Sequence, residues 1–106
     1  MIESNFDIQA DLVENPASTF FMRVGSDAMI ASGIEIGDKL VVDKAINPKH
    51  KDIVVAAIGG QFLVRRLYSQ GGKLELRSEN DNCQAIPLIG GLDEIWGVVT
   101  GVVRKY

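Results

Sequence analysis

Metal-ligating residue types occur in two short polar segments of the sequence. Glu79-Asn80-Asp81-Asn82 hints at cation binding through its side-chain oxygens. It lacks the ligand spacing and the acidic closing residue of a calcium loop, so a turn built from Asx hydrogen bonds is the simpler interpretation. Lys49-His50-Lys51 holds the single histidine without neighbouring ligands and is expected to be an exposed turn. We therefore expect neither a metal nor a cofactor.

The adjacent arginines Arg65 and Arg66 are candidates for binding phosphate or a partner. Neighbouring side chains on a strand point to opposite faces of a sheet, so the two guanidinium groups cannot form one patch. We expect a nearby carboxylate or carbonyl to bind Arg65, and we expect Arg66 to be solvated. The net charge of −3 and the pI of about 5.0 also argue against broad attraction to nucleic-acid phosphates.

Strand-forming segments separated by glycine-rich turns must position these residues. The expected strands are 19–24, 39–43, 52–58, 61–68, 74–77 and 94–105. Gly59-Gly60 and Gly71-Gly72 are typical of tight hairpin turns. Ser26-Asp27 can cap one short helical turn over 28–31, which Gly33 would end. This pattern predicts a mainly β fold, a closed or folded-over antiparallel sheet with one short helix.

Length and composition limit the number of domains, the disulfides and the membrane spans that the chain can form. With 106 residues, of which 46% are hydrophobic, the chain is expected to form one domain over 1–106, with 1–18 as a partly ordered N-terminal arm. The single cysteine, Cys83, excludes an intramolecular disulfide and fits a reducing compartment. No apolar run approaches the roughly 20 residues of a membrane span, and the acidic N-terminus is unlike a signal peptide. We expect a cytoplasmic protein with no membrane partner.

Three ordered groups of residues carry a family resemblance. The segments are 23–34 with 37–38 and 41–43, then 52–56 with 62–67, then 76–80 with 86–87 and 96–99. From about Asp7 to Tyr106 they resemble the self-cleaving serine peptidase domain shared by LexA repressors, many phage repressors and UmuD proteins. The segment 15–20 and His50 most resemble the UmuD branch in its processed form. The resemblance implies a folded β-sheet or barrel of the β-clip type.

That family cuts a peptide bond with a serine and a neutral lysine. The serine precedes the methionine of the first segment, and the lysine follows the valine on the strand after the hairpin. By resemblance, these positions are Ala28 and Arg65 in this sequence. Alanine has no nucleophilic atom, and arginine, with a pKa above about 12, is no base near neutral pH. We therefore predict an inactive site. Ser26 or Ser32 nearby is a weaker alternative nucleophile, and Ser26 is more simply a helix cap.

The resemblance also bears on cleavage targets and on DNA. Family members carry an Ala-Gly or Cys-Gly cleavage site N-terminal to this domain, and the sequence contains neither dipeptide. Met1 falls roughly where processed UmuD has lost its arm. There is no room for the winged helix-turn-helix that precedes the domain in LexA. We expect no self-cleavage target and no direct sequence-specific DNA binding.

The last expected strand is apolar or small on both faces. Trp96, Val98, Thr100 and Val102 are candidates for a homodimer interface, which the resemblance implies. A strand buried within its own barrel is equally compatible with the sequence.

These observations favour a catalytically inactive relative of processed UmuD. By resemblance, it would be a homodimeric accessory protein of the SOS response and error-prone DNA repair. Its partners would be a translesion DNA polymerase subunit and the RecA filament. One alternative is a repressor-type dimerisation domain that lacks its DNA-binding half and modulates an intact repressor. Another is an active self-cleaving serine peptidase that has been mutated at Ala28.

Overall fold

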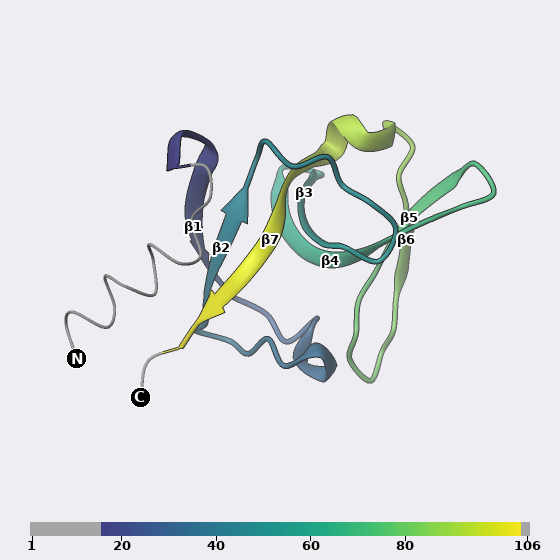
Figure 1. The fold of residues 1–106 in the computed structure, drawn as a ribbon. Coiled ribbons are helices and arrows are strands. Elements are labelled where there is room, and N and C mark those ends of the chain that lie inside the picture. The colour runs from purple at the N-terminus through teal and green to yellow at the C-terminus, as the bar shows by residue number, and fades with distance from the viewer. Residues whose placement is uncertain (1–15, 105–106) are drawn as a thin grey trace.

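Seven antiparallel strands form one folded sheet in a computed structural model that describes residues 16–104 (Figure 1). The strands are β1 (Thr19–Arg23), β2 (Lys39–Asp43), β3 (Ile53–Ile58), β4 (Gln61–Gln70), β5 (Lys73–Arg77), β6 (Ala85–Pro87) and β7 (Ile95–Val103). Their order in the sheet is β1-β2-β7-β3-β4-β5-β6, so β1 and β6 are its edges. The long β4 curves between the β1–β2–β7 part and the β5–β6 part. The mainly β fold is confirmed.

The helical segments of the described residues are three short 3-10 helices. They are η1 (Pro16–Ser18), η2 (Ile30–Ser32) and η3 (Gly91–Glu94). The predicted helical turn corresponds to η2, and it ends as expected at Gly33, whose φ is 86°. The sequence did not predict β6 or η3, since both are very short and β6 contains a proline. The predicted N-terminal arm lies, for residues 1–15, outside the described residues.

Two hairpins fix the register of β4. Gly59-Gly60 joins β3 to β4 and Gly71-Gly72 joins β4 to β5; all four glycines have positive φ, as a two-residue type I′ turn requires. Both hairpin predictions are confirmed. The pairing with β3 covers Gln61 to Arg66, whereas the pairing with β5 begins only at Arg66. Among residues 16–104, therefore, β4 has a neighbouring strand on one side alone up to Arg65.

The core consists of two apolar clusters. The first contains Val24, Met29, Ile34, Leu40, Val42 and Val55. The second contains Val54, Ala56, Leu67, Leu76, Leu88 and Val98. The adjacent residues Val54 and Val55 thus serve opposite faces of the sheet, and both are fully buried. This confirms that the middle of β3 is covered on both faces, as its continuous apolar run predicted.

Two register shifts interrupt the alternation of β7. Val41 pairs with Gly101 and Val42 with Val99, which leaves Thr100 outside the pairing; Trp96 is skipped in the same way opposite β3. Such bulges redirect the side chains that follow them. Val98 consequently packs into the second core cluster, so its assignment to a dimer surface was wrong. Trp96, Thr100 and Val102 remain exposed.

Candidate functional site

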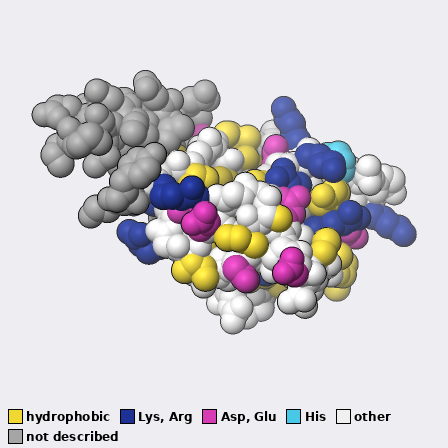
Figure 2. Space-filling view, turned by 90° about the horizontal axis from the view of Figure 1, so that it is seen from below, with side chains coloured by type: hydrophobic (Ala, Val, Ile, Leu, Met, Phe, Trp, Pro, Cys, Tyr) yellow, Lys and Arg dark blue, Asp and Glu magenta, His cyan; other side chains and the backbone are white. Residues whose placement is uncertain are grey.

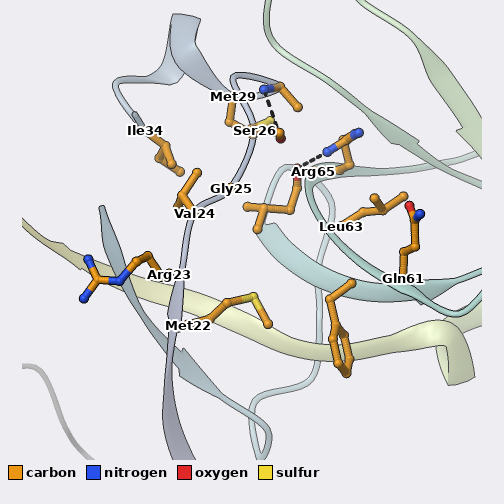
Figure 3. A pocket seen from close by; sticks show the side chains of 13 residues that line it. Met22, Arg23, Val24, Gly25, Ser26, Met29, Ile34, Gln61, Leu63 and Arg65 are labelled. Atoms are coloured by element: carbon orange, nitrogen blue, oxygen red, sulfur yellow. Dashed lines mark hydrogen bonds between the residues drawn. The ribbon is translucent and has the colours of Figure 1, made fainter. Parts of the chain in front are cut away.

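Two segments that are distant in the sequence form a groove of about 420 Å³ (Figure 3). Residues 22–26 contribute one wall together with Ala28, Met29 and Ile34, and residues 61–65 contribute the other. Ala28 and Arg65, the positions where the sequence resemblance predicts the serine and lysine of the family, therefore line the same groove. Most of the remaining lining side chains are apolar, and none is acidic.

Ala28 is well placed but chemically inert. It is buried, with 6% of its surface exposed, and its carbonyl accepts a hydrogen bond of 2.6 Å from the backbone N–H of Glu79. Its own N–H lies 3.4 Å from the hydroxyl of Ser26. The backbone of the turn is thus fixed, but its side chain is a methyl group that cannot attack a carbonyl carbon.

Arg65 has no acidic partner among residues 16–104. One of its terminal nitrogens, Nη1, donates a hydrogen bond of 2.8 Å to the carbonyl of Val64. This agrees with the expectation of a nearby carbonyl. Partial burial lowers the pKa of the Arg65 guanidinium from its usual value, because removal of water disfavours the charged form. Arginine nevertheless stays protonated in proteins, so Arg65 is a cation in the groove and cannot act as a base.

Arg66 was expected to be solvated, and this expectation was wrong. Its Nε and Nη2 donate to the two carboxylate oxygens of Glu79 at 2.9 and 3.0 Å. Nη1 donates to the carbonyl of Lys51 at 2.7 Å, and Nη2 also lies 3.3 Å from the hydroxyl of Ser32. These hydrogen bonds to the Glu79 carboxylate raise the pKa of Arg66. This bidentate pair is a structural clamp.

Glu79 also holds the turn that contains Ala28. Besides the bond to the Ala28 carbonyl, its own carbonyl accepts from the N–H of Ala31 at 2.8 Å. Its carboxylate accepts the hydroxyl hydrogen of Ser32. Sequence reasoning missed this role. The Asx turn beside it was predicted and is present, with the side-chain oxygen of Asn80 accepting from the N–H of Asn82 at 3.1 Å.

Neither alternative serine meets an available base. Ser26 lines the groove and is exposed, but the basic side chains of the groove lining are Arg23 and Arg65, both permanently protonated. Ser32 is bound to the Arg66–Glu79 pair and does not belong to the groove lining. The arrangement therefore supplies no activated nucleophile from residues 16–104.

A second polar cluster surrounds Tyr68, away from the groove. Lys51 Nζ and Arg77 Cζ lie 4.7 and 4.0 Å from the centre of its ring, and the His50 ring meets it edge-on at 5.6 Å. Figure 2 shows lysine and arginine side chains gathered around the histidine on this face. His50 Nδ1 accepts the N–H of Ser69 at 3.0 Å, so the histidine supports the turn. Within residues 16–104, no three histidine, cysteine or acidic side chains are grouped as metal ligands.

Comparisons with known proteins show the family of this chain. Residues 1–100 match the family model described as Peptidase S24-like. This chain belongs to the peptidase S24-like family. It is 37% identical over 103 residues to Protein ImpA of Salmonella typhimurium, covering 97% of this chain and 70% of that protein. It is 38% identical over 104 residues to Protein SamA of Salmonella typhimurium strain LT2, covering 97% and 71%.

The LexA repressor of Clostridium tetani is a further peptidase S24-like relative, 34% identical over 105 residues. The alignment covers 99% of this chain but 52% of that repressor, so the chain spans about half the length of such relatives. The LexA/UmuD-type resemblance seen in the sequence is therefore confirmed. The described part of the chain also has no helix long and apolar enough to cross a membrane.

Proposed function

We propose that this chain is a non-cleaving member of the peptidase S24-like family that acts by binding other proteins. One observation carries the proposal. Ala28 and Arg65 line the same groove, and the sequence resemblance predicts the hydroxyl and the neutral amine of the family at these two positions. Glu79 is hydrogen-bonded to the turn that contains Ala28, which is consistent with a groove that binds a partner without cleaving it.

Labelling with a fluorophosphonate, which reacts with activated serines, tests the loss of the nucleophile. The unmodified chain is expected to gain no adduct mass, because neither Ser26 nor Ser32 has a neutral base beside it. Ser26→Ala serves as the matched control. An adduct on the unmodified chain that disappears in Ser26→Ala would overturn the proposal, since it would reveal a substitute nucleophile in the groove.

Homodimerisation is the first protein–protein contact that we propose. Trp96, Thr100 and Val102 are exposed residues of β7, here called the β7 stripe, with Trp96 and Val102 exposed by 36% and 38%. The stripe continues into an aromatic cluster, where the Trp96 ring lies 4.0 Å from Phe20 and 4.9 Å from Phe62 between ring centres. Aromatic residues are enriched in protein interfaces and contribute much of their binding energy.

Sedimentation velocity with the substitution Val102→Asp tests this surface. A charge within the interface would convert the expected dimer to monomer, because an unpaired carboxylate would have to be desolvated. Ile89→Asp is the control, since Ile89 is 93% exposed and lies outside the stripe. A dimer that survives Val102→Asp, or an unmodified chain that is monomeric, would remove this part of the proposal.

We propose that the physiological role of this chain is an accessory function in the SOS response and error-prone DNA repair, in the cytoplasm. The partners would be a translesion polymerase subunit and the RecA filament. The similarity to ImpA and SamA, UmuD-like relatives, supports this role. The test is co-purification of the chain with the polymerase encoded beside its gene. Absence of any complex between the two purified proteins would contradict the role without touching the loss of cleavage.

The similarity to LexA repressors favours a second candidate, in which the chain forms mixed dimers with an intact repressor. Such mixing would change operator binding, because this chain would replace one subunit of the repressor dimer. Gel-shift titration of a full-length repressor with this chain distinguishes the candidates. Unchanged operator affinity excludes repressor modulation.

A further inference from the structure

The groove lies beside two strand edges that lack a neighbour in the described sheet. β1 is the last strand on its side of the sheet and pairs with β2 alone. From Gln61 to Arg65, β4 pairs with β3 on one side, and its other side is open until β5 begins opposite Arg66. Open edges offer backbone N–H and C=O groups to an extended peptide. A peptide that runs parallel to β4 along this open side therefore ends with its carboxyl terminus, or leaves the sheet, at Arg65.

The same place offers hydrogen-bond donors to an anion. A guanidinium has five N–H groups, and within residues 16–104 Arg65 uses one nitrogen, Nη1, for the carbonyl of Val64. No buried side-chain nitrogen or oxygen of the described chain lacks a partner, so the nitrogens of Arg65 that make no hydrogen bond are not fully buried. Ser26 is exposed on the facing wall, and Figure 3 shows it at the same end of the groove as Arg65.

The charge of the groove is opposite to that of the whole chain. The chain carries a net charge of −3, whereas the groove lining holds two arginines and no acidic residue. Apolar side chains, among them Met29, Ile34 and Leu63, form most of the remaining walls. An apolar cleft with a few polar groups at one end is a common form of ligand site, and the polar groups fix the orientation of the ligand.

We propose that this groove binds the free carboxyl end of an extended, apolar peptide, with the terminal carboxylate on Arg65 and Ser26. Arginine suits this role better than lysine, because its planar fork matches both oxygens of a carboxylate. An internal acidic residue fits less well, since the chain beyond it would meet β5. The inference rests on the proposed loss of cleavage, because a working peptidase would cut a peptide rather than retain its end.

NMR titration of the ¹⁵N-labelled full chain tests the inference with a panel of N-acetylated, alanine- and valine-based hexapeptides that differ in their last residue. Each peptide is used as free acid and as C-terminal amide. We expect at least one free acid to bind about tenfold more tightly than its amide, because a charge-assisted hydrogen bond is lost in the amide. The shifted resonances should belong to residues 22–29 and 61–65.

Three variants separate recognition from structural effects. Arg65→Gln should weaken binding of the free acid about tenfold, and Arg65→Lys should have an intermediate effect, because the charge remains and the fork is lost. Lys49→Gln is the control, since Lys49 is an exposed cation that does not line the groove. Its affinity should stay within about twofold of the unmodified chain.

Equal binding of acid and amide, or unchanged affinity in Arg65→Gln, would overturn the inference. So would absence of binding across the panel, or tighter binding of an amidated peptide with an internal glutamate. Mass spectrometry of the same samples keeps the two proposals apart. Cleaved peptide contradicts the proposed function, whereas intact peptide without preference for the free acid contradicts this inference alone.

Discussion

Arg65 and Arg66 are neighbours on β4 and have opposite surroundings. Arg66 donates to both oxygens of Glu79 and to the Lys51 carbonyl, whereas Arg65 binds one carbonyl, that of the residue before it. The Glu79 carboxylate raises the pKa of Arg66, and burial lowers that of Arg65. One guanidinium is therefore part of the fold, and the other is a charge available to a ligand.

The comparison shows that residue type alone does not decide the role of a charged side chain. A cation held by a carboxylate on the same chain contributes to stability, and its removal leaves the partner uncompensated. A cation that is partly desolvated without such a partner contributes little or opposes folding, so its retention calls for a functional reason. Substitutions on each side of this contrast should separate stability from binding.

The largest effect on stability is expected from Glu79→Gln. The substitution removes the charge that Arg66 binds and weakens the attachment of the turn that contains Ala28. Both side chains of the pair are about three-quarters buried, with 24% and 25% exposed, so the free energy of unfolding should fall by about 2 kcal/mol. Urea denaturation monitored by Trp96 fluorescence measures it.

Glu75→Gln is the matched control for that experiment. Glu75 pairs with Arg77, two positions further along the same strand β5, but these side chains are 34% and 41% exposed. Solvent screens such a pair, so the urea midpoint should hardly move. Equal losses in both variants would contradict the distinction between a clamp and a surface ion pair.

A smaller effect on stability is expected from Asp38→Asn, which removes the partner of a third arginine, Arg104. The exposure of the Arg104 ion pair makes it weaker than the Arg66–Glu79 pair. Arg104 Nη2 is 2.6 Å from Asp38, but the Arg104 side chain is 47% exposed. Hydrogen bonding to Arg104 lowers the pKa of Asp38 from 3.8 to about 2. Because the pKa of Asp38 is lower in the folded chain than in the unfolded chain, the ion pair stabilises the fold above about pH 4. This stabilisation is lost as the pH falls through about 2. After allowance for solvent screening, it amounts to about 1 kcal/mol.

Thermal unfolding at several pH values between about 5 and 2 measures this contribution. In Asp38→Asn the chain should be less stable near neutral pH, and its stability should fall less steeply in acid. If stability falls with the same slope in acid for both proteins, other carboxylates dominate the pH dependence of stability.

The smallest effect on stability is expected from Arg65→Gln. The substitution removes a partly desolvated cation that has no acidic partner among residues 16–104, so the free energy of unfolding should change by less than about 0.5 kcal/mol, or rise slightly. Urea denaturation measures the change. A loss as large as that of Glu79→Gln would assign Arg65 to the framework and would weaken the case for a ligand.

Sequence reasoning predicted most of the sheet because its signals are local. Glycine pairs at 59–60 and 71–72 require positive φ, and the apolar run of β3 needs cover on both faces. The same reasoning separated Arg65 from Arg66 through strand alternation. It missed the Arg66–Glu79 pair, because nothing near either residue specifies a partner 13 positions away. It also misplaced Val98, because the bulges of β7 depend on pairing with two other strands.

The double substitution Ala28→Ser with Arg65→Lys tests the central claim most directly, namely that the site kept its framework and lost two chemical groups. An Ala-Gly peptide is incubated with the unmodified chain and with the double variant, and the products are followed by mass spectrometry. The account predicts an intact peptide with the unmodified chain and cleavage at Ala-Gly with the folded double variant. Cleavage by the unmodified chain, or no cleavage by a correctly folded double variant, would contradict it.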